Sequence, residues 1–173
     1  VLADRRALST GVRLGALEDV EREESRDLGL RVFVGHRQAT VSGSDFSGPA
    51  RERLIERAVA MARLAPEDPY ADLAPGDRLA RGPFPNLELY DPTEPMAEAL
   101  EEAALAAEDA ARAVAGVTNS EGGSASWSTT HWLMATSGGF VGPHEVSGFS
   151  VSASVIAGEG DGMERGGEGR STR

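Results

Sequence analysis

Apolar and polar residues alternate with period two along much of the amino-terminal part of the chain, as expected of half-buried β-strands. The alternation breaks at Gly15-Ala16 and at Gly35-His36, and glycine at such a break is typical of a hairpin turn. We therefore expect four strands, paired as two hairpins, over residues 5–14, 17–24, 28–34 and 38–42. Leu8, Val12 and Leu14 are expected on one side of the first strand.

A second strand-forming block runs from Val117 to Ile156. It ends in Phe149–Ile156, where apolar residues alternate with serine or alanine. Gly138-Gly139-Phe140 is typical of a tight connection. The block predicts a meander of about three strands, with one face on the core and one smooth, uncharged face.

Two segments predict helices. Ser47-Gly48-Pro49 supplies a cap hydroxyl and an early proline for a helix to about Leu64. Asp91-Pro92-Thr93-Glu94 would start a second helix to about Ala115, closed by Gly116. Because strands cluster in two blocks, each beside a helix, we predict an α+β fold: about six or seven mainly antiparallel strands with two long helices packed on one face.

Length and charge narrow the possible functions. The 173 residues suit a single domain, and the absence of cysteine excludes disulfides and thiolate zinc sites. A formal charge of −11 opposes nucleic-acid binding, since phosphate contacts require basic residues. No apolar run is long enough to cross a bilayer, so we expect no membrane association and a cytoplasmic location. The start at Val1 suggests a segment of a longer protein.

Residues that could carry chemistry are few and dispersed. His36, His131 and His144 lack the spacing of metal ligands, and His36 is expected in an exposed turn. The helix glutamates are expected to form a solvated face; they are Glu98, Glu101, Glu102 and Glu108. We therefore predict no catalytic, cofactor-binding or metal-binding residue in this chain.

Two further patterns have structural and functional interpretations. Asn119–Gly123 could cradle a phosphate, but it lacks the lysine of a phosphate-binding loop and precedes a strand, which favours a turn or bulge. Trp127 and Trp132 could stack on a nucleobase, but the acidic charge favours core or subunit-interface packing. They could lie on neighbouring strands or on one long strand.

The ordered set of motifs resembles the amino-terminal domain of the TldD/PmbA family, also called modulator of DNA gyrase. The resemblance covers nearly the whole chain and is closer to the PmbA (TldE) branch. It is carried by Leu28–Gly35, Ser44-Asp45-Phe46-Ser47, the Val117–Ile156 block and Gly158–Arg165. Beyond Arg165 the chain departs from the PmbA-like pattern and continues with glycines.

The resemblance implies a role in proteolysis. In that family a TldD-type subunit carries an HExxxH zinc motif, located beyond the part matched here, and pairs with a PmbA-type subunit to cleave small or unfolded peptides. Residues 1–173 would then be a single amino-terminal domain that acts as scaffold and partner-binding part. Its partner would be a TldD-like subunit holding the zinc, or a second copy. The alternative is a self-contained ligand- or peptide-binding module with no link to proteolysis.

Overall fold

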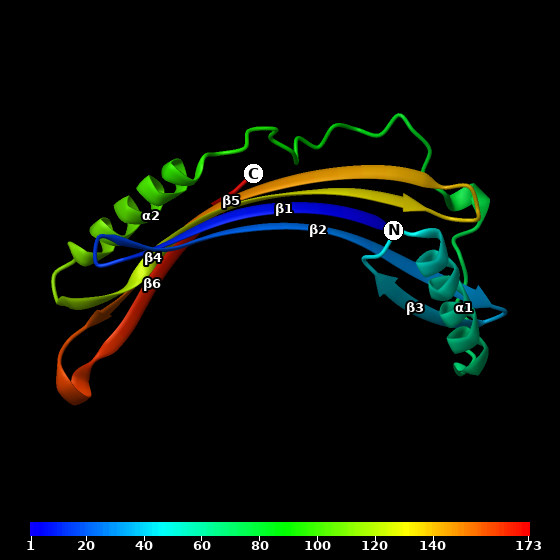
Figure 1. Ribbon diagram of the computed structural model, residues 1–173, viewed down its shortest axis with the longest axis horizontal. Helices are drawn as coiled ribbons and strands as arrows, with labels where there is room; N and C mark the ends of the chain where they lie inside the picture. The colour runs from blue at the N-terminus through cyan, green and yellow to red at the C-terminus, as the bar shows by residue number, and fades with distance from the viewer. The chain divides into compact units, whose positions relative to one another are not determined.

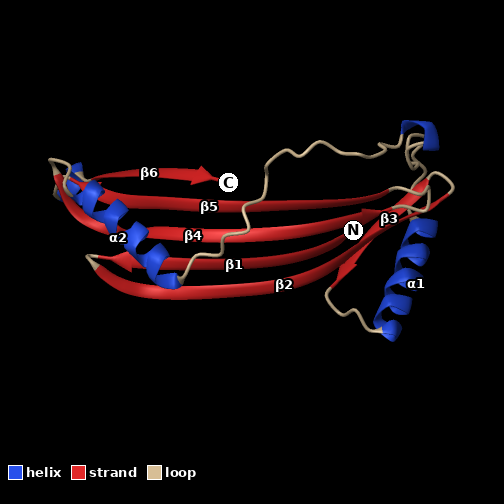
Figure 2. Cartoon of the chain, turned by 90° about the horizontal axis from the view of Figure 1, so that it is seen from above, coloured by secondary structure: helices blue, strands red, loops and turns tan.

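The computed structural model describes residues 1–173 and contains six strands and two long helices (Figure 1). The strands are antiparallel and form one sheet in the order β3-β2-β1-β4-β5-β6 (Figure 2). The elements are β1 (Leu2–Arg13), β2 (Ala16–Val34), β3 (Arg37–Gly43), α1 (Gly48–Leu64), α2 (Ala97–Arg112), β4 (Val117–Ala135), β5 (Val141–Ala157) and β6 (Glu164–Thr172), with 3₁₀ turns at Gly76–Arg78 and Gly160–Gly162. The predicted α+β class is confirmed.

The chain divides into two compact units, and the four longest strands run through both. Unit 1 comprises Val1–Asp4, Ser25–Leu87 and His131–His144, and unit 2 comprises Arg5–Glu24, Glu88–Thr130 and Glu145–Arg173. No helix in either unit combines the length and apolar character needed to cross a bilayer.

In unit 1 the hairpin of β2 and β3 forms as predicted. Its register pairs Leu28 with Gly43 and Val34 with Arg37, around the turn at Gly35-His36. The helix α1 packs against β3, and its Ala58 and Ala62 are fully buried because their small side chains allow close approach to the sheet.

The predicted cap of α1 is also present. Ser47 accepts a hydrogen bond from Ala50 N through its hydroxyl, and proline follows in the first turn. At the other end, the Arg37 guanidinium donates to Ala65 O (2.6 Å) and so satisfies a carbonyl beyond the last helical turn. Both ends of α1 are therefore fixed by side chains.

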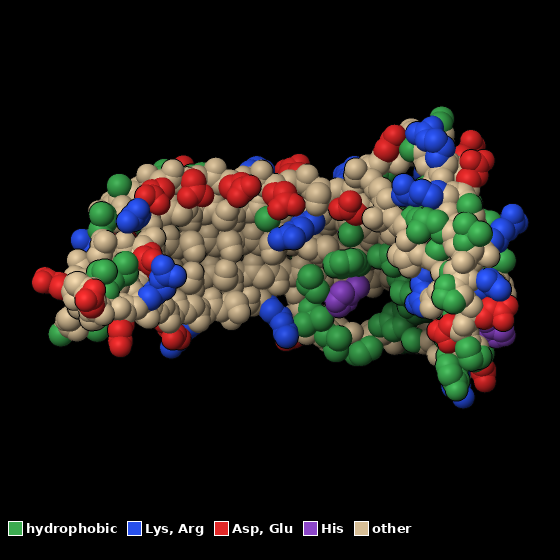
Figure 3. Space-filling model, turned by 90° about the horizontal axis from the view of Figure 1, so that it is seen from below, with side chains coloured by type: hydrophobic (Ala, Val, Ile, Leu, Met, Phe, Trp, Pro, Cys, Tyr) green, Lys and Arg blue, Asp and Glu red, His purple; other side chains and the backbone are tan.

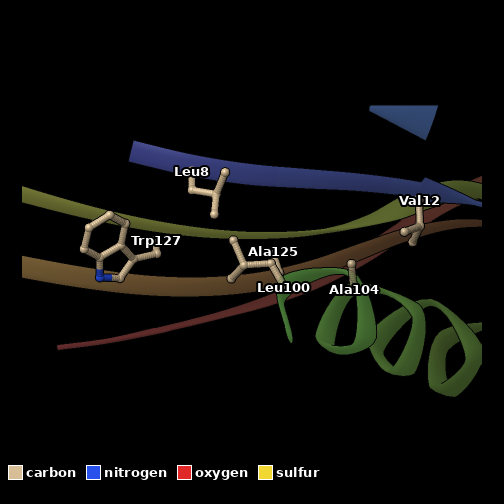
Figure 4. Packing of buried hydrophobic residues seen from close by; sticks show 6 residues of the cluster. All are labelled: Leu8, Val12, Leu100, Ala104, Ala125 and Trp127. Carbon is tan, nitrogen blue, oxygen red and sulfur yellow. The ribbon is translucent and has the colours of Figure 1, made fainter. Parts of the chain in front are cut away.

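The core of unit 2 lies between α2 and one face of β1 and β4 (Figure 4). Alternate residues of each strand point toward the helix, as the period of a strand requires. The buried cluster consists of Leu8, Val12, Leu100, Ala104, Ala125 and Trp127, with Phe149 and Val151 of β5 packed against it. Leu14, expected beside Leu8 and Val12, is instead 55% exposed because it lies in the β1–β2 turn.

Strand boundaries differ from prediction in three places. The acidic segment 17–24 and the apolar segment 28–34 are one continuous strand, β2. The meander predicted as about three strands consists of two long strands, β4 and β5. The glycine-rich segment after Met163 forms β6, which was not predicted, because pairing along β5 compensates for its low strand propensity.

The second helix begins later and ends earlier than predicted. Asp91 does not cap it: Asp91 Oδ1 accepts from Thr93 N (2.8 Å) in a local turn, and α2 starts at Ala97. Pro95 explains the delay, since a residue that precedes proline is biased away from helical backbone angles. The helix ends at Arg112, and Gly116 (φ 92°) lies in the turn to β4.

Candidate binding surface

The three histidines do not form a site. His36 lies exposed in the β2–β3 turn, as predicted, His144 is exposed on β5, and His131 is partly buried on β4. No group of three or more His, Cys, Asp or Glu side chains anywhere in residues 1–173 is placed to hold a metal ion.

The tryptophans lie on one long strand, β4, and not on neighbouring strands. Trp127 is 7% exposed and belongs to the core of unit 2, as predicted, whereas Trp132 is 43% exposed. Asn119–Gly123 lies within β4, which begins at Val117, and Gly122 has a positive φ of 121°.

The glutamates of α2 do not all face solvent. Glu98, Glu101 and Glu102 are at least partly exposed, but Glu108 is completely buried, so the prediction was wrong for this residue. Helical spacing explains its position, because Glu108 lies four residues after the buried Ala104 and therefore on the same face. This helical spacing is visible in the sequence, but the sequence does not indicate which residues would donate hydrogen bonds to a buried carboxylate.

The partners of Glu108 come from two distant segments. Its Oε1 accepts a hydrogen bond from Leu14 N (2.7 Å) and its Oε2 accepts one from Gly15 N (2.9 Å), both in the β1–β2 turn. The Ser120 hydroxyl of β4 donates a third. One carboxylate thus connects α2 with the turn and with β4, and its donors replace the water lost on burial.

The hydrogen bonds to Glu108 keep it ionised. Burial alone would raise the pKa of this carboxyl, but the bonds from Ser120, Gly15 and Leu14, with the nearby positive charge of Arg112, outweigh burial and lower the pKa below its ordinary value of 4.5. A depressed pKa in the folded state means that the folded chain holds the ionised form more tightly than the unfolded chain does.

Acid should therefore weaken the fold through Glu108. Its contribution is fully present above the unfolded pKa, near 4.5, and is lost as pH falls through the lower folded value. We expect Glu108→Gln to be less stable than the wild type at pH 7, with a difference that narrows toward pH 3, because glutamine does not titrate. Urea unfolding at several pH values measures this difference. A difference that stays constant down to pH 3 would contradict a lowered pKa.

The opposite face of the sheet in unit 2 carries a set of serines, here called the serine face. These side chains alternate with core residues, so they point away from α2. They are Ser124 and Ser126 of β4 and Ser150, Ser152 and Ser154 of β5. Hydroxyls pair across the strands, Ser124 with Ser152 (3.0 Å) and Ser126 with Ser150 (2.8 Å).

The serine face is not uncharged, contrary to prediction. Glu121 of β4 accepts a hydrogen bond from the Ser154 hydroxyl (2.7 Å) and forms an ion pair with Arg165 of β6 (2.5 Å). The hydrogen bond from the Ser154 hydroxyl lowers the pKa of Glu121 most, and the hydrogen bond and charge of Arg165 lower it further against the opposing effect of burial, so this carboxylate is ionised.

A polar hollow of about 530 Å³ lies on the serine face. Glycines Gly11, Gly167 and Gly169 line it and leave backbone accessible, and the register places Gly167 opposite Ser154 and Gly169 opposite Ser152. The acidic residues Glu18, Asp19 and Glu121 line it, whereas Glu168 pairs with Ala153 and so directs its side chain to the α2 side of the sheet. Figure 3 shows this face as small side chains and backbone with acidic groups along its border.

On the helix side, a groove of about 460 Å³ separates the carboxy-terminal half of α2 from β5 and β6. It is mostly apolar, and its lining includes Ala107, Ala111, Val114, Val151 and Val155. The two faces of β5 and β6 therefore differ in character: one offers apolar contacts, and the other offers hydroxyls and carboxylates.

The geometry of the serine face suits binding. Nucleophilic catalysis by serine needs a base within hydrogen-bonding reach, usually oriented by a third group. Here four of the hydroxyls pair with each other, and the base beside Ser154 is Glu121, whose lowered pKa makes it a weak base. The arrangement presents donors and acceptors to a ligand.

Comparison with known proteins covers nearly the entire chain. Residues 1–62 match the family model for domain 1 of the PmbA/TldA metallopeptidases, and residues 90–173 match the model for their central domain. The chain is 34% identical over 159 residues to the metalloprotease PmbA of Escherichia coli O157:H7, and 34% identical over 158 residues to its homolog in Haemophilus influenzae. Each match includes 91% of this chain and 35% of the relative, so the chain spans about a third of their length.

Solved structures share the fold. A putative modulator of DNA gyrase from Bacteroides thetaiotaomicron superposes with a TM-score of 0.86 at 22% identity, and TldE from Thermococcus kodakarensis with 0.77 at 18% identity. These matches include 98% and 99% of this chain and 39% of each neighbour. At this identity the similarity supports the fold alone.

Proposed function

The chain belongs to the TldD/PmbA family, and from that premise we propose that it is the scaffold and partner-binding part of a TldD/TldE-type metallopeptidase that cleaves small or unfolded peptides. We assign it to the PmbA-like, non-metal subunit, which works beside a zinc-bearing TldD-like subunit or as a homodimer. The observation that carries this proposal is the pair of family matches in chain order, together with 34% identity to two PmbA proteins.

Side-chain hydrogen bonds that join the helices to neighbouring elements support a scaffold role. Glu108 fixes α2 to β1 and β4, and Arg37 and Ser47 fix the ends of α1. The charge distribution favours peptide over nucleic acid as the bound polymer, since the chain carries −11 and its polar hollow is lined by carboxylates. It stays a prediction that residues 1–173 are a single amino-terminal domain of a longer, cytoplasmic protein.

Co-expression with candidate TldD-type subunits tests the proposal. We expect the two proteins to co-elute in size-exclusion chromatography, and we expect zinc-dependent cleavage of an unfolded peptide to require both. The control is a TldD-type subunit whose HExxxH glutamate is replaced by glutamine, which should assemble but not cleave, because that glutamate would act as the general base of a zinc peptidase.

Two results would count against the proposal. One is a protein that stays monomeric with every partner, and the other is cleavage that does not depend on this chain. If the chain still binds peptides in that case, the alternative of a self-contained peptide-binding module is supported.

A further inference from the structure

The serine face of unit 2 is open in this chain, while α2 covers the other face of the same strands. Ser124 and Ser152 are exposed, and the remaining serines of the face are partly exposed. Figure 3 shows no helix over this part of the sheet.

The face is poor in side-chain bulk, which suits close contact with an extended chain. Gly11, Gly167 and Gly169 bring no side chains to the hollow. Serine hydroxyls both donate and accept hydrogen bonds, so they can pair with either the N–H or the C=O of a peptide backbone. A flat surface with alternating hydroxyls and bare backbone favours an extended polypeptide over a small apolar ligand.

The charges around the hollow indicate which kind of polypeptide would bind there. Of the carboxylates on this side of the sheet, Glu121 is neutralised by Arg165, whereas Glu18 and Asp19 are exposed and form no ion pair. A second copy of this face would bring the same two unpaired carboxylates and would be repelled. A segment that carries arginine or lysine would be attracted.

We propose that the serine face binds an extended, basic polypeptide segment, with arginine or lysine side chains in the hollow beside Glu18 and Asp19 and backbone amides against Ser124 and Ser152. This inference deepens the proposed function. Only one part of it rests on that function, namely that the bound segment is an unfolded basic substrate of the peptidase complex. Binding itself requires no partner subunit and no cleavage.

Direct binding to the purified protein tests the inference. Three labelled twelve-residue probes, (Gly-Arg-Ser)₄, (Gly-Gln-Ser)₄ and (Gly-Glu-Ser)₄, are titrated and followed by fluorescence anisotropy at low and moderate salt. We expect the arginine probe to bind best and the glutamate probe worst, with a preference that salt reduces. The variant Glu18→Gln/Asp19→Asn should weaken binding of the arginine probe by roughly tenfold or more.

The matched control removes the same number of charges elsewhere. Glu52→Gln/Glu102→Gln changes two exposed glutamates, one on α1 and one on α2, and should change the affinity less than about twofold. A further variant, Ser152→Trp, fills the hollow without changing charge and should also weaken binding. Urea unfolding of every variant confirms that each one folds.

Three results would overturn the inference: no binding of the arginine probe, equal binding of all three probes, or equal loss of affinity in the double variant and its control. The last result would mean that only the net charge of the chain attracts the peptide. Because this assay contains no partner subunit, its outcome is independent of the cleavage test. The protein can bind the probe and fail to support proteolysis, or it can support proteolysis and fail to bind the probe.

Discussion

Replacing Glu108 with alanine should lower the free energy of unfolding by about 2–4 kcal/mol, because buried hydrogen-bonding groups lose their partner. Leu14 N, Gly15 N and the Ser120 hydroxyl all donate to this one carboxylate. The change also removes the connection between α2 and the β1–β2 turn, so the turn should become more mobile. Leu14 would be affected most, because it keeps a left-handed backbone (φ 52°) that non-glycine residues rarely adopt.

Urea denaturation at pH 7 measures this loss, and Glu102→Ala is its control. Glu102 lies on the same helix but is exposed, so its replacement should change the free energy of unfolding by less than about 0.5 kcal/mol. Hydrogen exchange at Leu14 and Gly15 reports the turn directly. Equal stability of the two alanine variants would show that the buried hydrogen bonds are not needed for the fold.

Replacing Gly123 with alanine should lower the free energy of unfolding by about 2–3 kcal/mol, because the added Cβ would overlap with backbone atoms of α2. A Cβ at Gly123 would collide with the carbonyl oxygen of Ala104 and would lie 3.1 Å from Glu108 Cβ. Gly123 is not in the left-handed region, so the cost is purely steric, and α2 must shift away from β4 to relieve it.

Gly166→Ala is the matched control for Gly123→Ala. Gly166 lies on β6, and a Cβ there has no neighbour within 4 Å, so we expect its free energy of unfolding to stay within about 0.5 kcal/mol of the wild type. Fluorescence of the core residue Trp127 should change in the Gly123 variant and not in the control. A Gly123 variant as stable as the control would mean that α2 packs less closely on β4 than the structure indicates.

Local patterns predicted the elements whose signals are local. The turn at Gly35-His36 and the cap at Ser47 depend on neighbours in sequence, and both were predicted correctly. The strand β6 depends on β5 for its pairing, and its glycines carry little strand preference of their own. The full length of β2 was missed because its acidic half lacks an apolar face, and every position from 17 to 24 is exposed.

The candidate surface was predicted only in part. The alternation in Phe149–Ile156 correctly indicated one face on the core, with Phe149 and Val151 packed there. The charges on the other face were missed, since Glu121 and Arg165 are far apart in sequence and meet only through strand pairing. Glu108 was missed for the same reason: its donors Leu14 and Gly15 lie more than ninety residues away along the chain.

The strand order β3-β2-β1-β4-β5-β6 has a consequence for how the chain reaches its fold. The first three strands in sequence form one side of the sheet and the last three form the other, and only β1 and β4 join them. Every other strand neighbour is also a neighbour in sequence, so each half can assemble through short-range pairing. Among the strand pairings, only that of β1 with β4 is long-range, and it forms together with the packing of α2 on β1. Because only the pairing of β1 with β4 joins the two halves of the sheet, the connector between α1 and α2 is the natural place to divide the chain. We expect the two resulting fragments to recombine.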